Sequence, residues 1–296
     1  MSSDVTEFLQ QLFNALRISG LYALVALGIT VIFGLTGIVK FSIAELITVG
    51  AFLTFSFWDH DRMVYFLAVP AAALSVGLLA LLLERAAFRF TLDQPINGFI
   101  VSLGLIVVLQ NSIIEIWGTN AKPSISIFTE VWDVGGVRMP ATDWFIIWVT
   151  VGLIAGLFLL LRRTKYGRAM RACADDREAA ALMGIPVDLM IAATFALGGV
   201  LAATAGGLLA SRENIHVYIG TAYLLKGFAV ALIGGLGNIE GAVIAALLVG
   251  LTETMAAAYG PGEWRDAYTF GLLIIVLLIR PRGLFRATGR LQETFQ

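Results

Sequence analysis

Residues 18–39, ISGLYALVALGITVIFGLTGIV, form an apolar run without a single charged side chain. A helix of about 20 such residues, rising 1.5 Å per residue, crosses the hydrocarbon core of a bilayer. Similar runs recur along the chain, and we predict nine spans: 18–39, 42–58, 63–83, 97–117, 143–161, 188–210, 222–236, 240–259 and 266–280. The second and seventh are short enough to be re-entrant or broken, so totals of eight or ten spans stay open. The sequence thus predicts an all-α, polytopic helical membrane protein with about 9 transmembrane helices.

The composition supports this class. Hydrophobic residues make up 58% of the 296 residues, charged residues make up 14%, and the mean hydropathy is +0.86. A soluble domain could not bury so much apolar surface in one core. We therefore treat residues 1–296 as a single transmembrane domain with lipid as its surroundings.

The distribution of basic residues predicts the orientation. Cytoplasmic connections are enriched in Lys and Arg. Alternating connections place most of the 20 basic residues on one side: Lys40, Arg85, Arg89, the six between Arg162 and Arg177, and Arg280, Arg282, Arg286 and Arg290. We therefore expect the N-terminus outside, the C-terminus inside, a cytoplasmic loop at 162–187 and an extracytoplasmic loop at 118–142.

Residues 161–186, LRRTKYGRAMRACADDREAAALMGIP, contain the signals of a short helix over about 176–183. Asp175 is a candidate N-cap, which would place Glu178 at the third helical position, the spacing of a capping box. Gly184 suits the left-handed position after the last turn, and Pro186 prevents continuation. Two turns of helix are too short to be stable alone in water, so we expect this helix to dock against a partner.

Ionisable residues inside the predicted spans are candidates for a translocation path, because charge at membrane depth is costly. Glu253 lies roughly 20 Å into the eighth span, where Lys226 could meet either Glu253 or Glu115. These three would line an outward-facing vestibule, or Lys226 would instead form a structural pair or snorkel to the interface. Glu45, near the start of the second span, would line the inner path or simply be hydrated. Gln110 and Asn111 are expected to form interhelical hydrogen bonds.

Two glycine-rich segments resemble each other and suggest an internal pseudo-repeat. FGLTGI at 33–38 and GLGNI at 235–239 are each followed by an apolar stretch. We expect hinges or tight turns at Gly34, Gly37, Gly234, Gly235 and Gly237.

Several activities find no support in the sequence. It contains no GxxxxGK[ST] phosphate loop, no GxSxG and no HExxH pattern, and its two histidines have no partner at metal-ligand spacing. Its one cysteine, Cys173, excludes an intrachain disulfide. We expect no enzymatic activity, no metal, no cofactor in this chain and no nucleic-acid partner. A self-sufficient, ion-coupled secondary transporter or channel remains an alternative.

The order and spacing of several segments resemble the membrane permease subunits of bacterial ABC importers for branched-chain amino acids, in particular the first of their two homologous permeases. The segments are GLYALVALGITVIFGLTGIVKFSIAE (20–45), LERAAFRF (83–90), GRAMRACADDREAAALMGI (167–185), FALGGVLAATAGGLLA (195–210), LKGFAVALIGGLGNIEGAVIAALLVGLTE (225–253) and LIRPRGLF (278–285).

This resemblance implies a function for the charged loop. Such permeases carry a Glu-Ala-Ala-x-x-x-Gly core, matched here by Glu178, Ala179, Ala180 and Gly184, which seats a coupling helix on an ATPase subunit. Leu182 and Met183 would add adaptable apolar contact.

The resemblance also implies partners and a substrate. The partners are a second permease or a copy of this chain, two cytoplasmic ATPases that hydrolyse ATP with Mg, and a periplasmic binding protein. The substrate would be Leu, Ile or Val, although relatives also carry urea, short amides or aromatic acids. Many relatives have Asn-Phe-Ala-His-Gly-Glu where this chain has KFSIAE (40–45), which puts in doubt any substrate assignment based on that segment.

Overall fold

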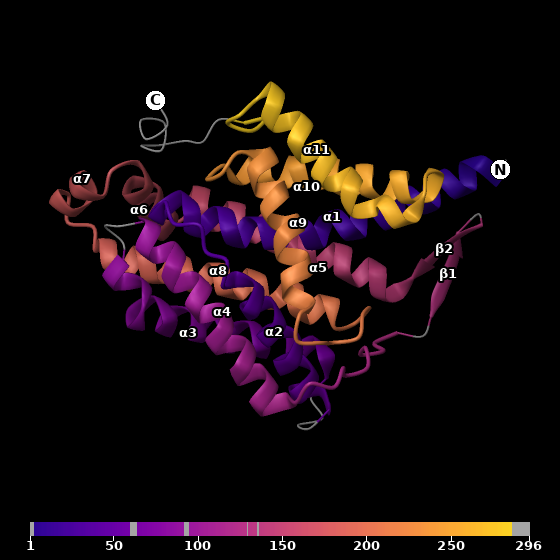
Figure 1. The fold of residues 1–296 in the computed structure, drawn as a ribbon, viewed down its shortest axis with the longest axis horizontal. Helices are drawn as coiled ribbons and strands as arrows, with labels where there is room; N and C mark the ends of the chain where they lie inside the picture. Colours follow the sequence, from indigo (N-terminus) through magenta and orange to yellow (C-terminus); the bar gives the residue numbers. More distant parts are fainter. Residues whose placement is uncertain (1–2, 60–63, 92–94, 129, 135, 286–296) are drawn as a thin grey trace.

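A computed structural model describes residues 3–59, 64–91, 95–128, 130–134 and 136–285 (Figure 1). Its helices are α1 (Ser3–Thr36), α2 (Ile43–Asp59), α3 (Tyr65–Ala86), α4 (Pro95–Trp117), α5 (Ala141–Arg163), α6 (Lys165–Asp175), α7 (Arg177–Leu182), α8 (Val187–Leu209), α9 (Ile219–Gly234), α10 (Ile239–Tyr259) and α11 (Arg265–Ile279). Short 3-10 turns, η1 (Phe88–Thr91) and η2 (Gly262–Trp264), and two strands, β1 (Val131–Val134) and β2 (Val137–Pro140), complete the described part.

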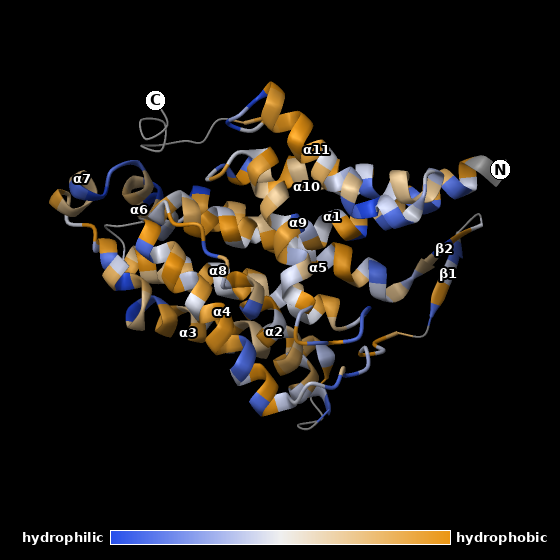
Figure 2. Ribbon diagram, in the orientation of Figure 1, coloured by the Kyte–Doolittle hydropathy of each residue, from blue (hydrophilic) through white to orange (hydrophobic). Residues whose placement is uncertain are grey.

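The helices confirm a multi-pass membrane protein. Within the described residues, 6 helices are long and apolar enough to cross a bilayer, namely α1, α3, α4, α5, α8 and α10. The remaining predicted spans are occupied by α2, α9 and α11, of 17, 16 and 15 residues. Figure 2 shows apolar residues along most helices and hydrophilic ones around α6 and α7 and in the first part of α1. The total of nine crossings stays a prediction.

The most buried of these six spans is α1, which packs against α8, α9 and α10. Glycines allow such backbones to approach closely, as expected where helices associate inside a membrane. A Cβ atom added at Gly250 of α10 would lie 2.1 Å from Ser19 Oγ of α1. A Cβ added at Gly206 of α8 would lie 1.9 Å from the Ile47 carbonyl oxygen of α2. The core therefore depends on small residues at these crossings.

The predicted cytoplasmic connections meet at one end of the molecule, which we call the α7 end. Arg162 pairs with Glu240, and Arg89 pairs with Asp188, so the connections after α3, α5, α7 and α9 are neighbours. Figure 1 shows α6 and α7 at this end, and the N-terminus and the two strands at the other, which we call the hairpin end. Arg286 and Arg290 lie outside the described residues.

The hairpin end has two features that were not predicted. Within the segment 118–142, β1 and β2 pair antiparallel, and valines on both sides of the turn favour strands. Likewise, α1 begins at Ser3 and not near residue 18. Its first turns are held by this hairpin: the Gln10 side chain donates to the Arg138 carbonyl at 2.9 Å and accepts from the Arg138 N–H at 2.8 Å.

Candidate functional site

The short helix α7 has a defined start. The Asp176 carboxylate accepts hydrogen bonds from the N–H groups of Glu178 (2.9 Å) and Ala179 (3.1 Å), which makes Asp176 the N-cap. The prediction of Asp175 as the cap was wrong, because Asp175 is the last residue of α6 and only Asp176 is extended, with φ −154°. Glu178 therefore occupies the second helical position and not the third.

The end of α7 is a Schellman motif. Gly184 has φ +81°, its N–H donates to the Ala181 carbonyl at 2.9 Å, and the Ile185 N–H donates to the Ala180 carbonyl at 3.0 Å. Glycine adopts this left-handed backbone without the strain of a side chain. The helix is thus fixed at both ends by its own sequence.

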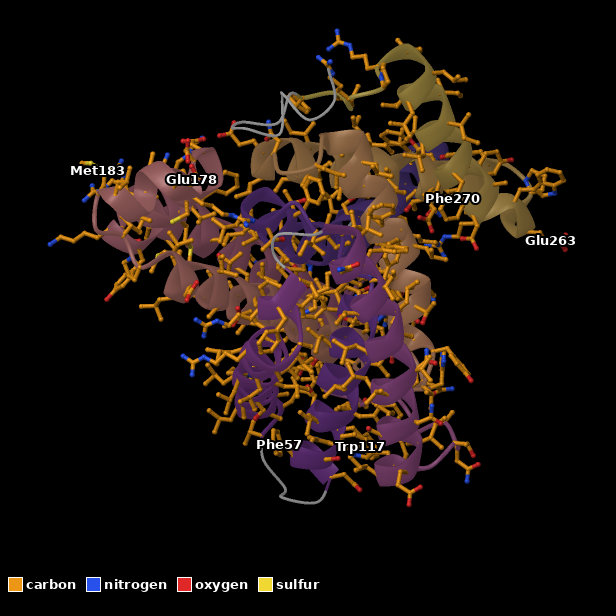
Figure 3. The ribbon with its side chains drawn as sticks, turned by 60° about the vertical axis from the view of Figure 1, so that its left-hand side comes forward. Phe57, Trp117, Glu178, Met183, Glu263 and Phe270 are labelled. Carbon is orange, nitrogen blue, oxygen red and sulfur yellow. The ribbon has the colours of Figure 1, made fainter. Side chains whose placement is uncertain are left out.

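The two faces of α7 have different surroundings. Ala180 is 4% exposed and faces the body of the protein, whereas Leu182 and Met183 are 88% and 82% exposed. Figure 3 shows Glu178 and Met183 at the outer edge of the α7 end. Two large apolar side chains so fully exposed at the edge of a small helix form a surface suited to a partner.

A partly buried arginine joins α7 to α1. The Arg177 guanidinium donates from Nε (3.2 Å) and Nη2 (2.7 Å) to the carbonyl oxygen of Leu35. Leu35 lies in the last turn of α1, where carbonyls have no partner within the helix. The end of α1 and the start of α7 are therefore joined directly.

The sequence analysis missed α6, the helix that precedes α7. Thr164 caps it by accepting from the Gly167 N–H at 3.0 Å, and its buried residues Gly167, Met170 and Cys173 recur every three residues. This cap and this spacing were readable from the sequence. Burial raises the pKa of the Cys173 thiol, against an opposing effect of Arg177, so this cysteine is a packed side chain.

The two glycine segments lie together at the α7 end. Gly37, Gly235 and Gly237 have φ of 70°, 95° and 88°, which only glycine adopts easily. Gly34 lies within α1 and Gly234 is the last residue of α9. A Cβ added at Gly34 would lie 3.5 Å from Gly237 Cα, so the turn from α9 to α10 contacts α1 one residue before Leu35, which binds Arg177.

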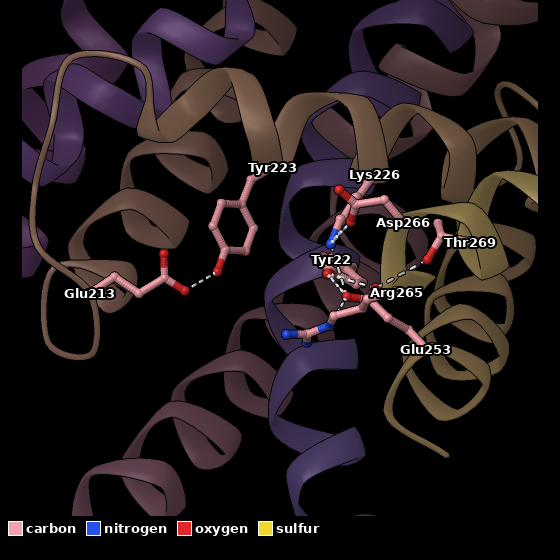
Figure 4. Close-up of polar contacts among 8 residues, drawn as sticks. All are labelled: Tyr22, Glu213, Tyr223, Lys226, Glu253, Arg265, Asp266 and Thr269. Atoms are coloured by element: carbon pink, nitrogen blue, oxygen red, sulfur yellow. Dashed lines mark hydrogen bonds and ion pairs between the residues drawn. The ribbon is translucent and has the colours of Figure 1, made fainter. Parts of the chain in front are cut away.

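Near the opposite end, Glu253 is the centre of a buried polar cluster (Figure 4). Its side chain is 0% exposed and accepts from Tyr22 Oη (2.8 Å), Lys226 Nζ (2.8 Å) and Thr269 Oγ1 (3.2 Å). Arg265 also forms an ion pair with it, and Lys226 bridges to Asp266 at 2.8 Å. The cluster ties α1, α9, α10 and α11 together through one carboxylate.

The four candidate path residues do not form one group. Lys226 meets Glu253, while Glu115 is exposed on α4. Glu45 is 0% exposed on α2 and accepts from Gln110 Nε2 of α4 at 3.0 Å, which is the interhelical hydrogen bond expected for Gln110. The second oxygen of Glu45, Oε2, has no hydrogen-bond partner among the described residues. Asn111, for which the same was expected as for Gln110, donates instead to the Val107 carbonyl of its own helix at 2.7 Å.

Lys40, the first residue of the KFSIAE segment, is a buried cation. In the connection between α1 and α2, its Nζ lies 4.7 Å from the Phe88 ring centroid and 4.5 Å from that of Phe195. Nζ has no hydrogen-bond partner among the described residues. Complete burial lowers the pKa of Lys40 to about 7, and Glu84 opposes this shift. The two rings replace water around the ammonium only in part.

Within the described residues, no group of three His, Cys, Asp or Glu side chains could hold a metal ion.

Comparison with known proteins gives a consistent result. The model of a family described as the permease component of the branched-chain amino acid transport system matches residues 11–277. The high-affinity branched-chain amino acid permease LivH of Escherichia coli K12 is 33% identical, covering 96% of this chain and 97% of its own. BraD of Pseudomonas aeruginosa is 32% identical, covering 95% and 96%. A probable LivH of Methanocaldococcus jannaschii is 27% identical, covering 92% and 90%.

The Lys40 site predicts a pH-dependent stability. In the unfolded chain this lysine has a pKa near 10.5, so between pH 7 and 10.5 the unfolded state binds more protons and stability rises with pH. Lys40→Met removes the burial cost. We expect it to be more stable than the wild type at pH 6, with the difference shrinking by about 2 kcal/mol between pH 7 and 9. Thermal unfolding of the purified chain in detergent measures this, and exposed Lys165→Met is the control. A difference that is the same at pH 6 and pH 9 would contradict the assignment.

The Glu253 cluster predicts a large stability difference between two glutamates. Glu253→Ala leaves Lys226 and Arg265 without their buried partner, and we expect a loss of about 3–5 kcal/mol. Glu115→Ala, at an exposed position, should change stability by less than about 0.5 kcal/mol. Unfolding midpoints in detergent compare the two variants. Equal midpoints would show that the cluster does not hold the helices together.

Proposed function

The chain belongs to the family of permease components of branched-chain amino acid transport systems, and from this premise we propose that it forms one membrane subunit of an ATP-driven importer for Leu, Ile and Val. This is a family of transport permeases and not a class of enzymes. ATP and Mg are used by separate ATPase subunits. The observation that carries the mechanism is α7, which exposes an apolar edge on one side and is anchored to α1 on the other.

The exposed edge of α7 is the proposed contact with an ATPase subunit. Leu182 and Met183 would enter a groove of the partner, with Glu178 and Ala179 on the same exposed surface. Ala180 has a different role from its neighbours, because it is buried and seats the helix on the permease itself. Gly184 sets the direction in which the chain leaves the helix. The Glu-Ala-Ala-x-x-x-Gly core thus contributes residues to both the exposed and the buried face of α7, which we call the lever.

Movement of α7 would reach the membrane through two connections. Before α7, Arg177 holds the end of α1. After α7, the chain enters α8, whose Phe195 packs against Lys40 in the connection from α1 to α2. Both connections converge on residues 35–40. We assign to this segment, with the adjacent turns at Gly37 and Gly237, the role of passing the ATPase motion to the membrane helices.

For the translocation path we propose Glu45 as the principal charged residue. Its carboxylate has one oxygen bound to Gln110 of α4 and spare acceptor capacity on the other, which suits the ammonium of an amino acid. Separation of α4 from α2 would uncover it. Glu253 and Lys226, which already bind one another, would instead hold the outer part of the bundle rigid, and Glu115 would face the surroundings of α4.

The proposed orientation places the α7 end in the cytoplasm of a bacterial cell and the hairpin end outside, with nine crossings, the N-terminus out and the C-terminus in. A periplasmic binding protein would deliver substrate at the hairpin end, and a second permease or a copy of this chain would complete the path. The names of the relatives favour branched-chain amino acids over urea, short amides or aromatic acids. An ion-coupled secondary transporter or channel would not need α7 and its exposed edge.

The coupling role is tested by Leu182→Ser combined with Met183→Ser in the assembled importer. Burying two such side chains in a partner groove contributes about 1.5–3 kcal/mol each, so we expect substrate-stimulated ATPase activity to fall more than tenfold. Leu189→Ser, at an exposed leucine of α8 outside the lever, is the matched control and should retain stimulation. ATPase assays in vesicles, with immunoblots for insertion, measure both. Undiminished stimulation in the double variant would refute the coupling surface.

A further inference from the structure

A cavity of about 650 Å³ lies at the α7 end, between α1, α5, α6 and the start of α10. Its floor is formed by α1 at Thr30, Val31 and Gly34. Arg162 of α5 and Arg168 and Arg171 of α6 line it and are exposed, so they lie where it opens. Neither the lever nor the proposed path uses these three arginines.

The charges around this cavity are unbalanced. Glu240 of α10 is already paired with Arg162. Among the described residues, Arg168 and Arg171 have no ion-pair partner, and Asp175 is the one other acidic residue of the lining. The two arginines are three residues apart on α6 and therefore lie on one face of that helix. Guanidinium groups so arranged bind a phosphate with charge-assisted hydrogen bonds.

Apolar side chains line the cavity beside the polar Thr30, Thr194 and Asn238. Phe158 and Leu161 of α5 and Ile239 of α10 line it. Further along the same two helices, Leu159, Ile244 and Leu248 are exposed apolar side chains. A free phosphate ion would leave these walls hydrated, whereas the acyl chains of a lipid would cover them. Basic pockets between spans on the cytoplasmic side are suited to anionic headgroups.

We propose that this cavity binds an anionic phospholipid, with its phosphate on Arg168 and Arg171 and its acyl chains along the groove between α5 and α10. The assignment rests on the proposed orientation, in which the α7 end faces the cytoplasm. The lipid would touch α6 and the Gly34–Leu35 turn of α1 together, next to the Arg177 anchor. It would thereby hold α6 and α7 against the end of α1, as they lie in this structure.

Native mass spectrometry of the assembled importer, titrated with phosphatidylglycerol or phosphatidylcholine, tests this site. We expect preferential phosphatidylglycerol binding that falls at least tenfold in Arg168→Ala/Arg171→Ala. The matched control is Arg163→Ala/Lys165→Ala, which removes the same charge from two exposed residues where α5 meets α6, outside the cavity. Its phosphatidylglycerol binding should stay within about twofold of the wild type. Arg171→Gln alone, which perturbs folding less, should lower binding severalfold.

Four results would overturn the proposal. Equal losses in the two double variants would show general surface attraction, and equal binding of both lipids by the wild type would exclude an anionic site. Competition by glycerol 3-phosphate at the concentration effective for phosphatidylglycerol would assign a free phosphate. Absence of lipid from an intact wild-type importer would indicate that the partner permease covers the groove. None of these results alters the outcome expected for the Leu182 and Met183 variants, so the lipid site and the coupling role fail separately.

Discussion

The hydrogen bonds from Arg177 to the Leu35 carbonyl join α7 to α1, which is the most buried of the six helices long enough to cross a bilayer. Without them α7 would keep its caps at Asp176 and Gly184 but would lose this contact with α1. Because α1 packs against α8, α9 and α10 at glycine crossings, we propose that a displacement at Leu35 would be passed to these helices.

The two ends of the molecule are held together by different kinds of interaction. At the hairpin end, one buried carboxylate on Glu253 satisfies donors from three other helices, an arrangement that resists rearrangement. At the α7 end, α1 meets the turn between α9 and α10 through glycines, Arg177 binds the Leu35 carbonyl, and Lys40 lies between two rings. In the proposed orientation, a stiff outer part and a deformable inner part would suit a permease whose motion starts at the cytoplasmic surface. A lipid beside Leu35 would set the resting position of that deformable part.

The sequence predicted the elements that depend on local chemistry. The class followed from apolar runs, and the left-handed backbone of Gly184 followed from the end of a short helix. Turns were expected at five glycines, of which Gly37, Gly235 and Gly237 have positive φ whereas Gly34 and Gly234 lie in helices. Counting residues along the spans left Glu253 and Glu115 as partners of Lys226, and the structure pairs it with Glu253. Features set by packing escaped it. Nothing local showed that Ala180 would face inward, that Tyr22 and Arg265 would join Glu253, or that Lys40 would lie between Phe88 and Phe195. Asp175 was predicted as an N-cap because α6, although readable from its own cap and spacing, was not recognised. The hairpin was missed because its strands are only four residues each.

The contact between Arg177 and Leu35 can be tested by measuring substrate taken up per ATP hydrolysed by the assembled importer in vesicles. Arg177→Ala leaves Leu182 and Met183 in place, so the ATPase subunits should still bind and hydrolyse ATP. If α7 acts through Leu35, uptake per ATP falls at least tenfold, while exposed Arg163→Ala behaves as the wild type. Unchanged uptake per ATP in Arg177→Ala would contradict the central claim that this contact carries the motion into the membrane.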